Sequence, residues 1–246
     1  MRRLFSPHLG AVNDVLSLDK SASHHARVLR LQVGEAVQLF DGEGGTAKAS
    51  LVALDGDRVD VRIESVEHDA RASDYASVTL VQAMPKGEKL DSIMRMATEL
   101  GVDAIRLLSS ERTVIQLDKE RGASRLARLQ RIASEASRQS SQSRVPEIVT
   151  PTTLDELVRV IPLDATHLLF VPDAVEHVAE ALARESKIAR AVWVWVGPEG
   201  GFSPHEVETL AQSGALPVRM FESVLRVETA APIALALVLH ALRGRR

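Results

Sequence analysis

The stretch Trp193–Leu210 reads WVWVGPEGGFSPHEVETL and predicts a strand, a glycine loop and a helix in that order. Residues Ala191–Val196 are apolar and rich in β-branched and aromatic side chains, which is typical of a buried strand. Ser203 stands where a helix N-cap is expected, Pro204 follows at the first helical position, and Glu206 completes a capping box. The loop between such a strand and helix lies where α/β proteins bind ligands, outside the carboxyl end of a strand.

The loop contains Gly197, Pro198, Gly200 and Gly201, so few side chains would keep a ligand away from its backbone N–H groups. It matches neither the G-x-G-x-x-G fingerprint nor the Walker pattern with its lysine and hydroxyl. On the loop alone, an ordinary tight turn and a ligand-binding loop remain equally open.

The composition is that of a globular protein with one large domain or two modest ones. The chain has 246 residues, of which 45% are hydrophobic and 26% charged. It contains no cysteine, which excludes disulfides, thiolate zinc sites and thiol nucleophiles. The start, MRRLFSPHLG, lacks the apolar core of a signal peptide, and the apolar run Ala230–Leu239 is too short to cross a bilayer. We expect a cytoplasmic protein without a membrane span.

Positive charge gathers in one segment although the whole chain carries a net charge of −3. Between Lys119 and Arg144, seven basic residues stand against two acidic ones, a local excess of five positive charges. A basic face on an acidic protein is typical of binding to a polyanion, but a solvated helix face has the same pattern. The seven are Lys119, Arg121, Arg125, Arg128, Arg131, Arg138 and Arg144.

The first 70 residues are predicted to be rich in β-structure. Three alternating apolar runs at 36–40, 46–54 and 58–66, separated by Gly/Asp turns, predict a meander that closes best as a small barrel. Before them, Ser21–Arg30 is predicted as one short helix, on which Arg27 and Arg30 would share a face.

After a predicted linker at His68–Tyr75, strands alternate with helices, which predicts a parallel sheet covered on both faces. We therefore expect domains at 1–70 and 75–246. The expected strands are 78–84, 104–108, 167–171, 191–196 and 217–221, and the expected helices are 87–100, 120–139, 154–160, 175–185 and one from about 229.

The last helix is apolar on every side from Ala230 to Leu239, so it must be buried all round. Either a second subunit supplies one of the walls around it, or the helix lies inside a single large domain.

Taken together, these pieces resemble the RsmE-type family of 16S ribosomal RNA uridine-N3 methyltransferases of the SPOUT superfamily, along the whole chain. The motifs that carry the resemblance are Arg3-Leu4-Phe5, His24–Arg30, Lys86–Leu90, Ala97–Val102, Ser110–Arg112, Gln139-Ser140, Arg144–Glu147, Gly197–Ser203 and Leu225–Ala230.

The resemblance implies a PUA-like β-barrel followed by an α/β domain with a C-terminal trefoil knot, and a homodimer that binds S-adenosylmethionine bent into the knot. The implied reaction is methylation of N3 of a uridine in 16S ribosomal RNA, in the decoding region of the small subunit. The residues implied to bind the cofactor are Val171, Gly197, Pro198, Glu199, Gly200, Gly201, Met220, Phe221, Leu225, Glu228, Thr229 and Ala230.

Arg226 is the candidate for stabilising the charge on the uridine, because a guanidinium offers several donors in one plane; a structural ion pair with Glu228 is the alternative. No metal is expected. The candidates for phosphate contacts, which position RNA without reading its sequence, are Arg3, Arg27, Arg30, Arg112, Arg138 and Arg144.

The chain departs from the family pattern at Met220-Phe221-Glu222-Ser223, where Leu-Gly-Pro-Arg is usual. The Phe221 ring would then lie beside the cofactor or point into the sheet. Two other functions remain open: methylation of another RNA such as transfer RNA, and a non-catalytic RNA-binding or ribosome-assembly protein in which Phe221 closes the pocket.

Overall fold

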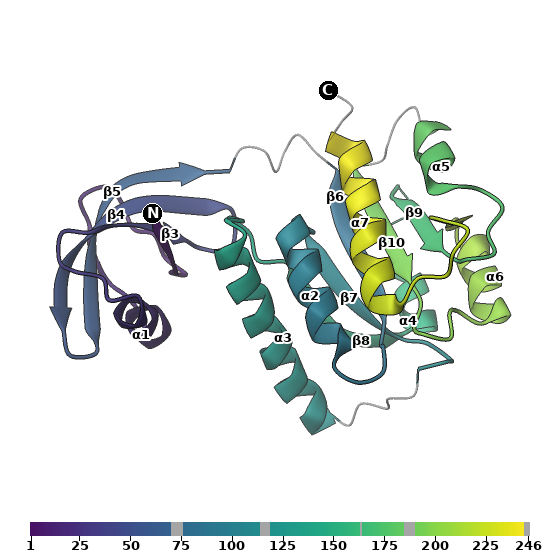
Figure 1. Cartoon of the computed structure of the whole chain (residues 1–246), viewed down its shortest axis with the longest axis horizontal. Helices are drawn as coiled ribbons and strands as arrows, with labels where there is room; N and C mark the ends of the chain where they lie inside the picture. The colour runs from purple at the N-terminus through teal and green to yellow at the C-terminus, as the bar shows by residue number, and fades with distance from the viewer. Residues whose placement is uncertain (70–75, 114–118, 163, 185–189, 244–246) are drawn as a thin grey trace. The chain divides into compact units, whose positions relative to one another are not determined.

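The computed structural model describes residues 1–69, 76–113, 119–162, 164–184 and 190–243, with the backbone alone at 119–121 (Figure 1). The chain divides into two compact units. The first contains Met1–Asp74 and Ser134–Val145, and the second contains Tyr75–Ala133 and Pro146–Arg246. Residues Ser134–Val145, which the sequence placed in the second domain, therefore pack with the first. The predicted linker at 68–75 lies mostly outside the described residues.

The first unit is built on a five-stranded sheet in the order β1-β3-β4-β5-β2. The predicted meander is confirmed, and its three strands are antiparallel neighbours. Strand β1 was not predicted; it joins the sheet by parallel pairing with β3, a contact that sequence alternation does not report. The strands are β1 Arg2–Phe5, β2 Val15–Ser17, β3 Ala36–Phe40, β4 Gly45–Asp55 and β5 Arg58–His68.

Helix α1, Lys20–Val28, packs against β1 and β5, and Asp19 caps its first turn by accepting from the Ala22 amide at 2.7 Å. The helix ends before Arg30, whose φ of 55° is left-handed. The expectation that Arg27 and Arg30 share a helical face is therefore wrong, because Arg30 lies beyond the last helical turn.

The second unit is an α/β layer structure whose six strands are all parallel, in the order β11-β9-β10-β6-β7-β8. The predicted parallel sheet is confirmed. Its strands are β6 Ser77–Ala83, β7 Ala104–Ser109, β8 Glu147–Thr153, β9 Thr166–Phe170, β10 Ala191–Val196 and β11 Leu216–Val218. Its helices are α2 Lys89–Leu100, α4 Leu154–Val158, α5 Val178–Arg184, α6 Pro204–Gln212 and α7 Val227–Arg243, together with α3 Lys119–Gln139 as far as Ala133.

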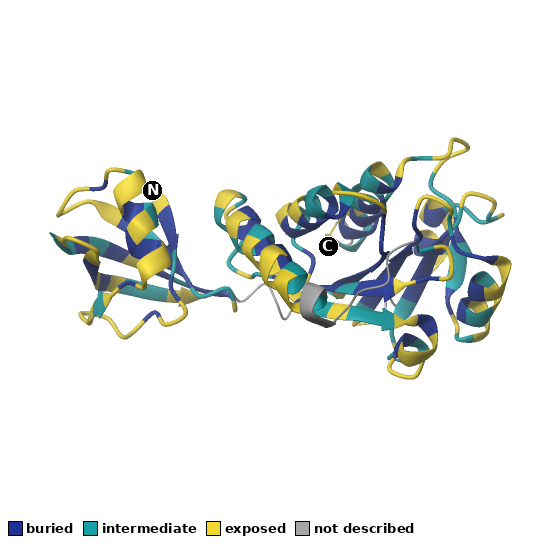
Figure 2. Ribbon diagram, turned by 90° about the horizontal axis from the view of Figure 1, so that it is seen from below, coloured by how far each residue is buried: buried dark blue, intermediate teal, exposed yellow. Residues whose placement is uncertain are grey.

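Strand β10 lies in the middle of this sheet and is buried on both faces, as its continuous apolar sequence predicts (Figure 2). Helices α2 and α7 pack against each other, and α7 contacts β6 and β10. Trp193 and Trp195 belong to a core cluster that includes Leu157 of α4 and Leu210 of α6. The two tryptophans therefore anchor the layer that carries the glycine loop.

Within the described part of the chain, helix α7 is not buried on all sides, so the alternative in which it lies inside a single domain is wrong. Covering by a second subunit stays a prediction. Ala231, Leu235 and Val238 are buried, but Ala236 is exposed and Leu237 only half-buried. An apolar stripe of the helix is therefore left without a full covering by the described part of the chain. Among the described residues, no helix combines the length and hydrophobicity needed to span a bilayer.

Candidate functional site

The glycine loop after β10 has the predicted geometry, but its glycines are required for different reasons. A Cβ on Gly197 would lie 3.0 Å from the Phe202 amide nitrogen and 3.1 Å from the Gly201 carbonyl carbon. Gly201 has a φ of +69° with nothing near its missing Cβ. Gly197 is therefore fixed by the loop folding back on itself, and Gly201 by backbone conformation.

The predicted capping box at the start of α6 is confirmed, and its Glu206 carboxylate also bonds to the loop that follows β7. Ser203 Oγ accepts from the Glu206 amide at 3.1 Å, and Glu206 Oε2 accepts from the Ser203 amide at 2.8 Å. The buried Glu206 carboxylate also accepts from the Glu111 amide through Oε1 at 2.9 Å. One side chain thus ties the glycine loop to the loop that follows β7.

The opposite wall is the segment between β11 and α7. The chain leaves the sheet at Arg219, whose amide donates to the Glu176 carbonyl at 2.9 Å and whose carbonyl accepts from the Val178 amide at 2.9 Å. At its other end, the Arg226 carbonyl accepts from the amides of Thr229 and Ala230 and so begins α7. Both ends of the segment are therefore anchored by backbone hydrogen bonds.

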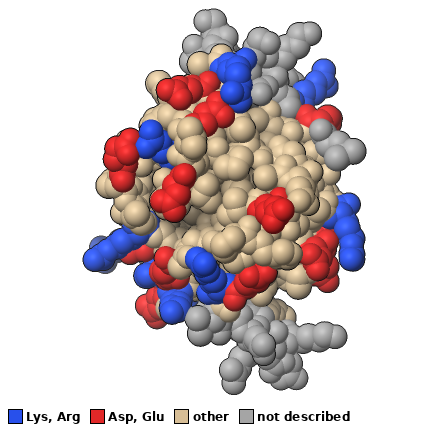
Figure 3. Space-filling view, turned by 90° about the vertical axis from the view of Figure 1, so that its right-hand side faces the viewer, with Lys and Arg blue, Asp and Glu red and all other residues tan. Residues whose placement is uncertain are grey.

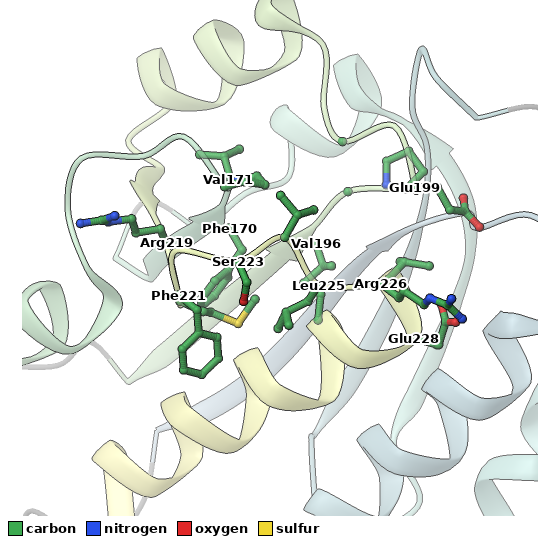
Figure 4. A pocket seen from close by; sticks show the side chains of 18 of the residues that line it. Phe170, Val171, Val196, Glu199, Arg219, Phe221, Ser223, Leu225, Arg226 and Glu228 are labelled. Atoms are coloured by element: carbon green, nitrogen blue, oxygen red, sulfur yellow. The ribbon is translucent and has the colours of Figure 1, made fainter.

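These walls enclose a pocket of about 410 Å³ outside the carboxyl ends of β9, β10 and β11 (Figure 4). Most of its lining is apolar side chain or backbone; Glu199, Arg226 and Glu228 lie at one side and Arg219 at the other (Figure 4). Its lining residues are Lys89, Phe170, Val171, Pro172, Val196, Gly197, Pro198, Glu199, Gly201, Val218, Arg219, Met220, Phe221, Ser223, Val224, Leu225, Arg226, Val227, Glu228 and Ala230.

Glu199 and Lys89 form the charged side of the pocket. Lys89 Nζ lies 2.7 Å from Glu199 Oε1 and 3.8 Å from Glu228 Oε2. The Lys86 amide donates to the Glu199 carboxylate at 3.1 Å. Burial raises the pKa of the Glu199 carboxyl, but hydrogen bonds from Lys89 and the Lys86 amide outweigh it, so the pKa lies below its usual value. Glu199 is thus an ionised clamp between the glycine loop and the start of α2.

Glu228 keeps one free acceptor. Its Oε2 atom is buried and has no hydrogen-bond partner among the described residues, although Lys89 lies close enough to balance its charge. A buried oxygen in this state gains from any donor that enters the pocket.

Arg226 lies at the pocket on the same side as Glu228, and its side chain is exposed (Figure 4). The alternative ion pair between Arg226 and Glu228 does not form. Among the described residues, no carboxylate lies within 4.0 Å of the Arg226 guanidinium. The Arg226 side chain also makes no hydrogen bond with another described residue, so within that part of the chain its five N–H donors are available at the mouth of the pocket.

Phe221 lies at the rim of the pocket with 45% of its surface exposed. It neither points into the sheet nor fills the space, so the alternative in which Phe221 closes the pocket is wrong. The ring takes up room at the edge while the backbone of the segment forms the wall (Figure 4).

Comparison with known proteins gives the family of the chain. Residues 72–239 match the family described as RNA methyltransferase domain, and residues 18–64 match the RNA methyltransferase PUA domain. The chain is 32% identical over 219 residues to ribosomal RNA small subunit methyltransferase E of Mycobacterium tuberculosis, covering 87% of this chain and 82% of that protein. The chain belongs to the ribosomal RNA small subunit methyltransferase E family.

Solved structures of this family have the same fold. The enzyme of Neisseria gonorrhoeae, solved bound to S-adenosyl methionine, superposes with a TM-score of 0.87 at 29% identity, covering 97% of this chain and 96% of that one. A protein of Legionella pneumophila, solved with the cofactor SAM, gives a TM-score of 0.86 at 32% identity over the same shares. The predicted family and the PUA-like N-terminal domain are therefore confirmed.

Within this family member, the pocket gathers Arg226 and most residues expected at the cofactor. Gly200 and Thr229 do not line it. Arg112 Nη1 donates to the Gly200 carbonyl, and Thr229 is exposed in the first turn of α7. Arg112 thus braces the glycine loop from outside.

Arg3 is buried, so the expectation that it contacts RNA phosphate is wrong. Its guanidinium donates to the carbonyls of Ser137 and Gln142, at 3.4 and 3.1 Å, and lies 4.7 Å from the centre of the Phe40 ring. Burial lowers its pKa. Its donors already hold Ser134–Val145 within the first unit.

The other five candidate arginines differ in whether a carboxylate of the described residues holds the side chain. Arg138 is held by Glu135, with its Nε 2.9 Å from Glu135 Oε2, and Arg27 by Asp57 at 2.5 Å. Neither cation is free. Arg30, Arg112 and Arg144 are exposed.

The sequence missed Lys89, the one ionic link from α2 to both Glu199 and Glu228 in the described chain. Its position inside the motif Lys86–Leu90 was the available signal, but nothing in the spacing shows that this motif meets the glycine loop.

Proposed function

We propose that this protein transfers a methyl group from S-adenosylmethionine to N3 of a uridine in the 16S RNA of the small ribosomal subunit. The observation that carries the proposal is the backbone-walled pocket at the carboxyl ends of β9–β11 with a free arginine at its mouth. Such a substrate would place the protein in the cytoplasm, where ribosomes are made.

The pocket fits this cofactor in size and chemistry. Its volume of about 410 Å³ lies within the range of about 300–1,000 Å³ typical of small-molecule sites. Phe170, Val196 and Leu225 offer apolar surface for a purine and for the carbon chains attached to the sulfonium sulfur. The unpartnered oxygen of Glu228 suits a hydroxyl or ammonium donor. When bound, S-adenosylmethionine supplies the electrophilic methyl group.

Val171, Gly197, Pro198, Glu199, Gly201, Met220, Phe221, Leu225, Glu228 and Ala230 are proposed to hold the cofactor. Most of this holding is done by backbone, because both walls are loops anchored at each end. Rigid walls place the reacting carbon and the attacking nitrogen in line, which is the main contribution a protein makes to such a transfer.

Arg226 is proposed to bind the target base. N3 of uridine loses a proton during the reaction, and negative charge then spreads onto the flanking carbonyl oxygens. A guanidinium with unoccupied donors can hydrogen-bond these oxygens as the charge develops. The base must be unpaired to expose its Watson–Crick edge, so the enzyme needs a single-stranded or displaced nucleotide.

Two further features of the family are proposed for this chain. The second unit threads a C-terminal trefoil knot, in which the loops before α6 and α7 pass one another around the pocket. The protein forms a homodimer through α7, which is supported by the half-buried Ile233 and Leu237 and the exposed Ala236. Sedimentation of the purified chain tests the dimer: a monomer at micromolar concentration contradicts it.

The decisive experiment maps methylated uridines in ribosomal RNA from a deletion strain complemented with wild type or Arg226→Ala. We expect one N3-methylated uridine in small-subunit RNA to disappear on deletion, to return with wild type, and to stay absent with Arg226→Ala. Loss of a mark in transfer RNA instead would favour the alternative substrate. Full methylation by the variant would remove Arg226 from the mechanism.

A further inference from the structure

A second hollow of the second unit lies between the start of α2 and the middle of α3. It encloses about 690 Å³ and is lined on one side by Gly87, Glu88 and Asp91. Arginines of α3 line the other side. We call this hollow the α2–α3 groove.

Three arginines of α3 face the groove at successive intervals of three residues. Arg125, Arg128 and Arg131 therefore form one stripe of the helix. Arg128 is paired with Asp91 across the groove. Arg125 and Arg131 have no hydrogen bond or ion pair with another described residue, and Arg131 is exposed. The groove thus holds two cations whose charge is not balanced by a bonded carboxylate.

The groove and the methyl-transfer pocket share a short piece of chain. Gly87 and Glu88 line the groove, and Lys89 lines the pocket. Gly87 and Lys89 are two residues apart, so their Cα atoms are separated by at most about 7 Å. The phosphates next to a base held in the pocket would therefore be within reach of the groove.

The face in Figure 3 and two arginines of the first unit offer less to a polyanion. On the face that Figure 3 shows, basic and acidic groups alternate around the margin, and acidic groups also lie nearer the middle. Arg3 and Arg138 of the first unit are occupied by partners of their own.

We propose that the α2–α3 groove binds the RNA backbone beside the target uridine, with Arg125 and Arg131 each contacting a phosphate. Arg128, held by Asp91, fixes the distance between the two helices. This inference rests on the proposed function and adds the surface by which the substrate strand is oriented. Guanidinium groups suit this contact because they bind phosphate through paired donors.

The test measures binding of the full-length protein to transcribed 16S ribosomal RNA across a salt series. For single strands the logarithm of the affinity falls with the logarithm of salt by about 0.7 per phosphate contact. The double variant Arg125→Ala/Arg131→Ala should lose about 1.4 of this slope and bind about ten-fold or more weakly at low salt. Binding of S-adenosylmethionine should stay unchanged.

Arg159→Ala is the matched control. Arg159 is exposed in the same unit, at the end of α4, and lines neither hollow. It should leave the salt slope within about 0.3 of wild type. A third variant should change RNA binding in the opposite direction. Glu88→Gln removes a negative charge from the groove without losing a cap, because Glu88 makes no side-chain capping bond, and it should tighten RNA binding about two-fold or more.

The outcomes distinguish failure of the groove proposal from failure of the proposed function. A double variant with wild-type affinity and salt slope, in a protein that still methylates RNA, would overturn the groove and leave the proposed function standing. Weakening of similar size in Arg159→Ala would also overturn it. A wild-type protein that neither binds nor methylates RNA would overturn both.

Discussion

Replacing Gly197 with alanine tests whether the glycine loop binds the cofactor through its own shape. The added Cβ would lie 3.0, 3.1 and 3.2 Å from three backbone atoms of Gly201 and Phe202. Ordinary van der Waals contact begins at about 3.4 Å, so the loop must open by a few tenths of an ångström. Backbone atoms cannot move aside as a flexible side chain can, and overpacking of this kind costs about 1–3 kcal/mol.

The displaced atoms include the Phe202 amide, which follows directly on the wall of the pocket. If about 2 kcal/mol of this strain must be overcome to restore the binding geometry, the Kd for S-adenosylmethionine rises about 30-fold. Calorimetric titration measures this Kd. Thermal unfolding without ligand measures how much of the strain destabilises the free protein. Both should be determined on the same preparation.

Alanine substitutions at two other glycines distinguish a steric clash from backbone strain and from the effect of an added Cβ alone. Gly201→Ala meets nothing within 4 Å but forces a residue with Cβ to a φ of +69°, so only conformational strain of about 1 kcal/mol is expected. Gly122→Ala in α3 meets nothing and has an ordinary φ, so it should be neutral or stabilising. Wild-type affinity and unfolding temperature for Gly197→Ala would refute the reasoning.

Three further substitutions test the supports of the site. Lys89→Met should raise the Kd for S-adenosylmethionine about two- to five-fold, because Glu199 and Glu228 lose their shared cation. Glu206→Ala should lower the free energy of unfolding in urea by about 2–4 kcal/mol, because the buried Ser203 amide and the partly buried Glu111 amide lose their acceptor. His167 makes stability depend on pH: burial lowers its pKa in the folded protein, so the proton binds the unfolded chain more tightly. Stability is then complete above a pH of about 6.5 and falls below it, by at most about 1.4 kcal/mol per pH unit, until the folded-state pKa is reached.

Each of these has a control on the same element or site. Lys89→Arg keeps the charge and should restore most of the affinity. Glu208→Ala removes an exposed side chain from the same helix as Glu206 and should cost less than about 0.5 kcal/mol. His167→Gln cannot titrate, so its unfolding free energy should lose the wild-type slope between pH 7 and 5. An equal slope in that variant would assign the pH dependence to other groups.

Much of the second unit could be predicted because its elements are marked locally. Strand β10 and the Ser203–Glu206 capping box were found where expected, and Gly101 ends α2 in the left-handed conformation with a φ of 82°. Each of these three features is determined by residues only a few positions apart in the sequence. Caps and buried strands are therefore visible in the sequence itself.

The strands that were missed are those defined by distant partners. Strand β8, Glu147–Thr153, contains a proline and three threonines and has one buried residue, so it shows no apolar alternation. It is a strand because it pairs with β7 at the edge of the sheet. Strand β11 was predicted to reach Phe221 but ends at Val218, because Arg219 bonds instead to the chain before α5.

The early end of β11 also decides where the Phe221 side chain lies. Had the strand continued, Phe221 would have been fixed by the pleat of the sheet and its ring directed into one face. Because the chain leaves the sheet at Arg219, residues 219–226 form a loop held at both ends by backbone bonds, and the ring turns out to the rim with 45% exposure. A wall made of main chain thus leaves room at the rim for a side chain as large as that of Phe221, as long as the two anchoring ends, at Arg219 and Arg226, are kept.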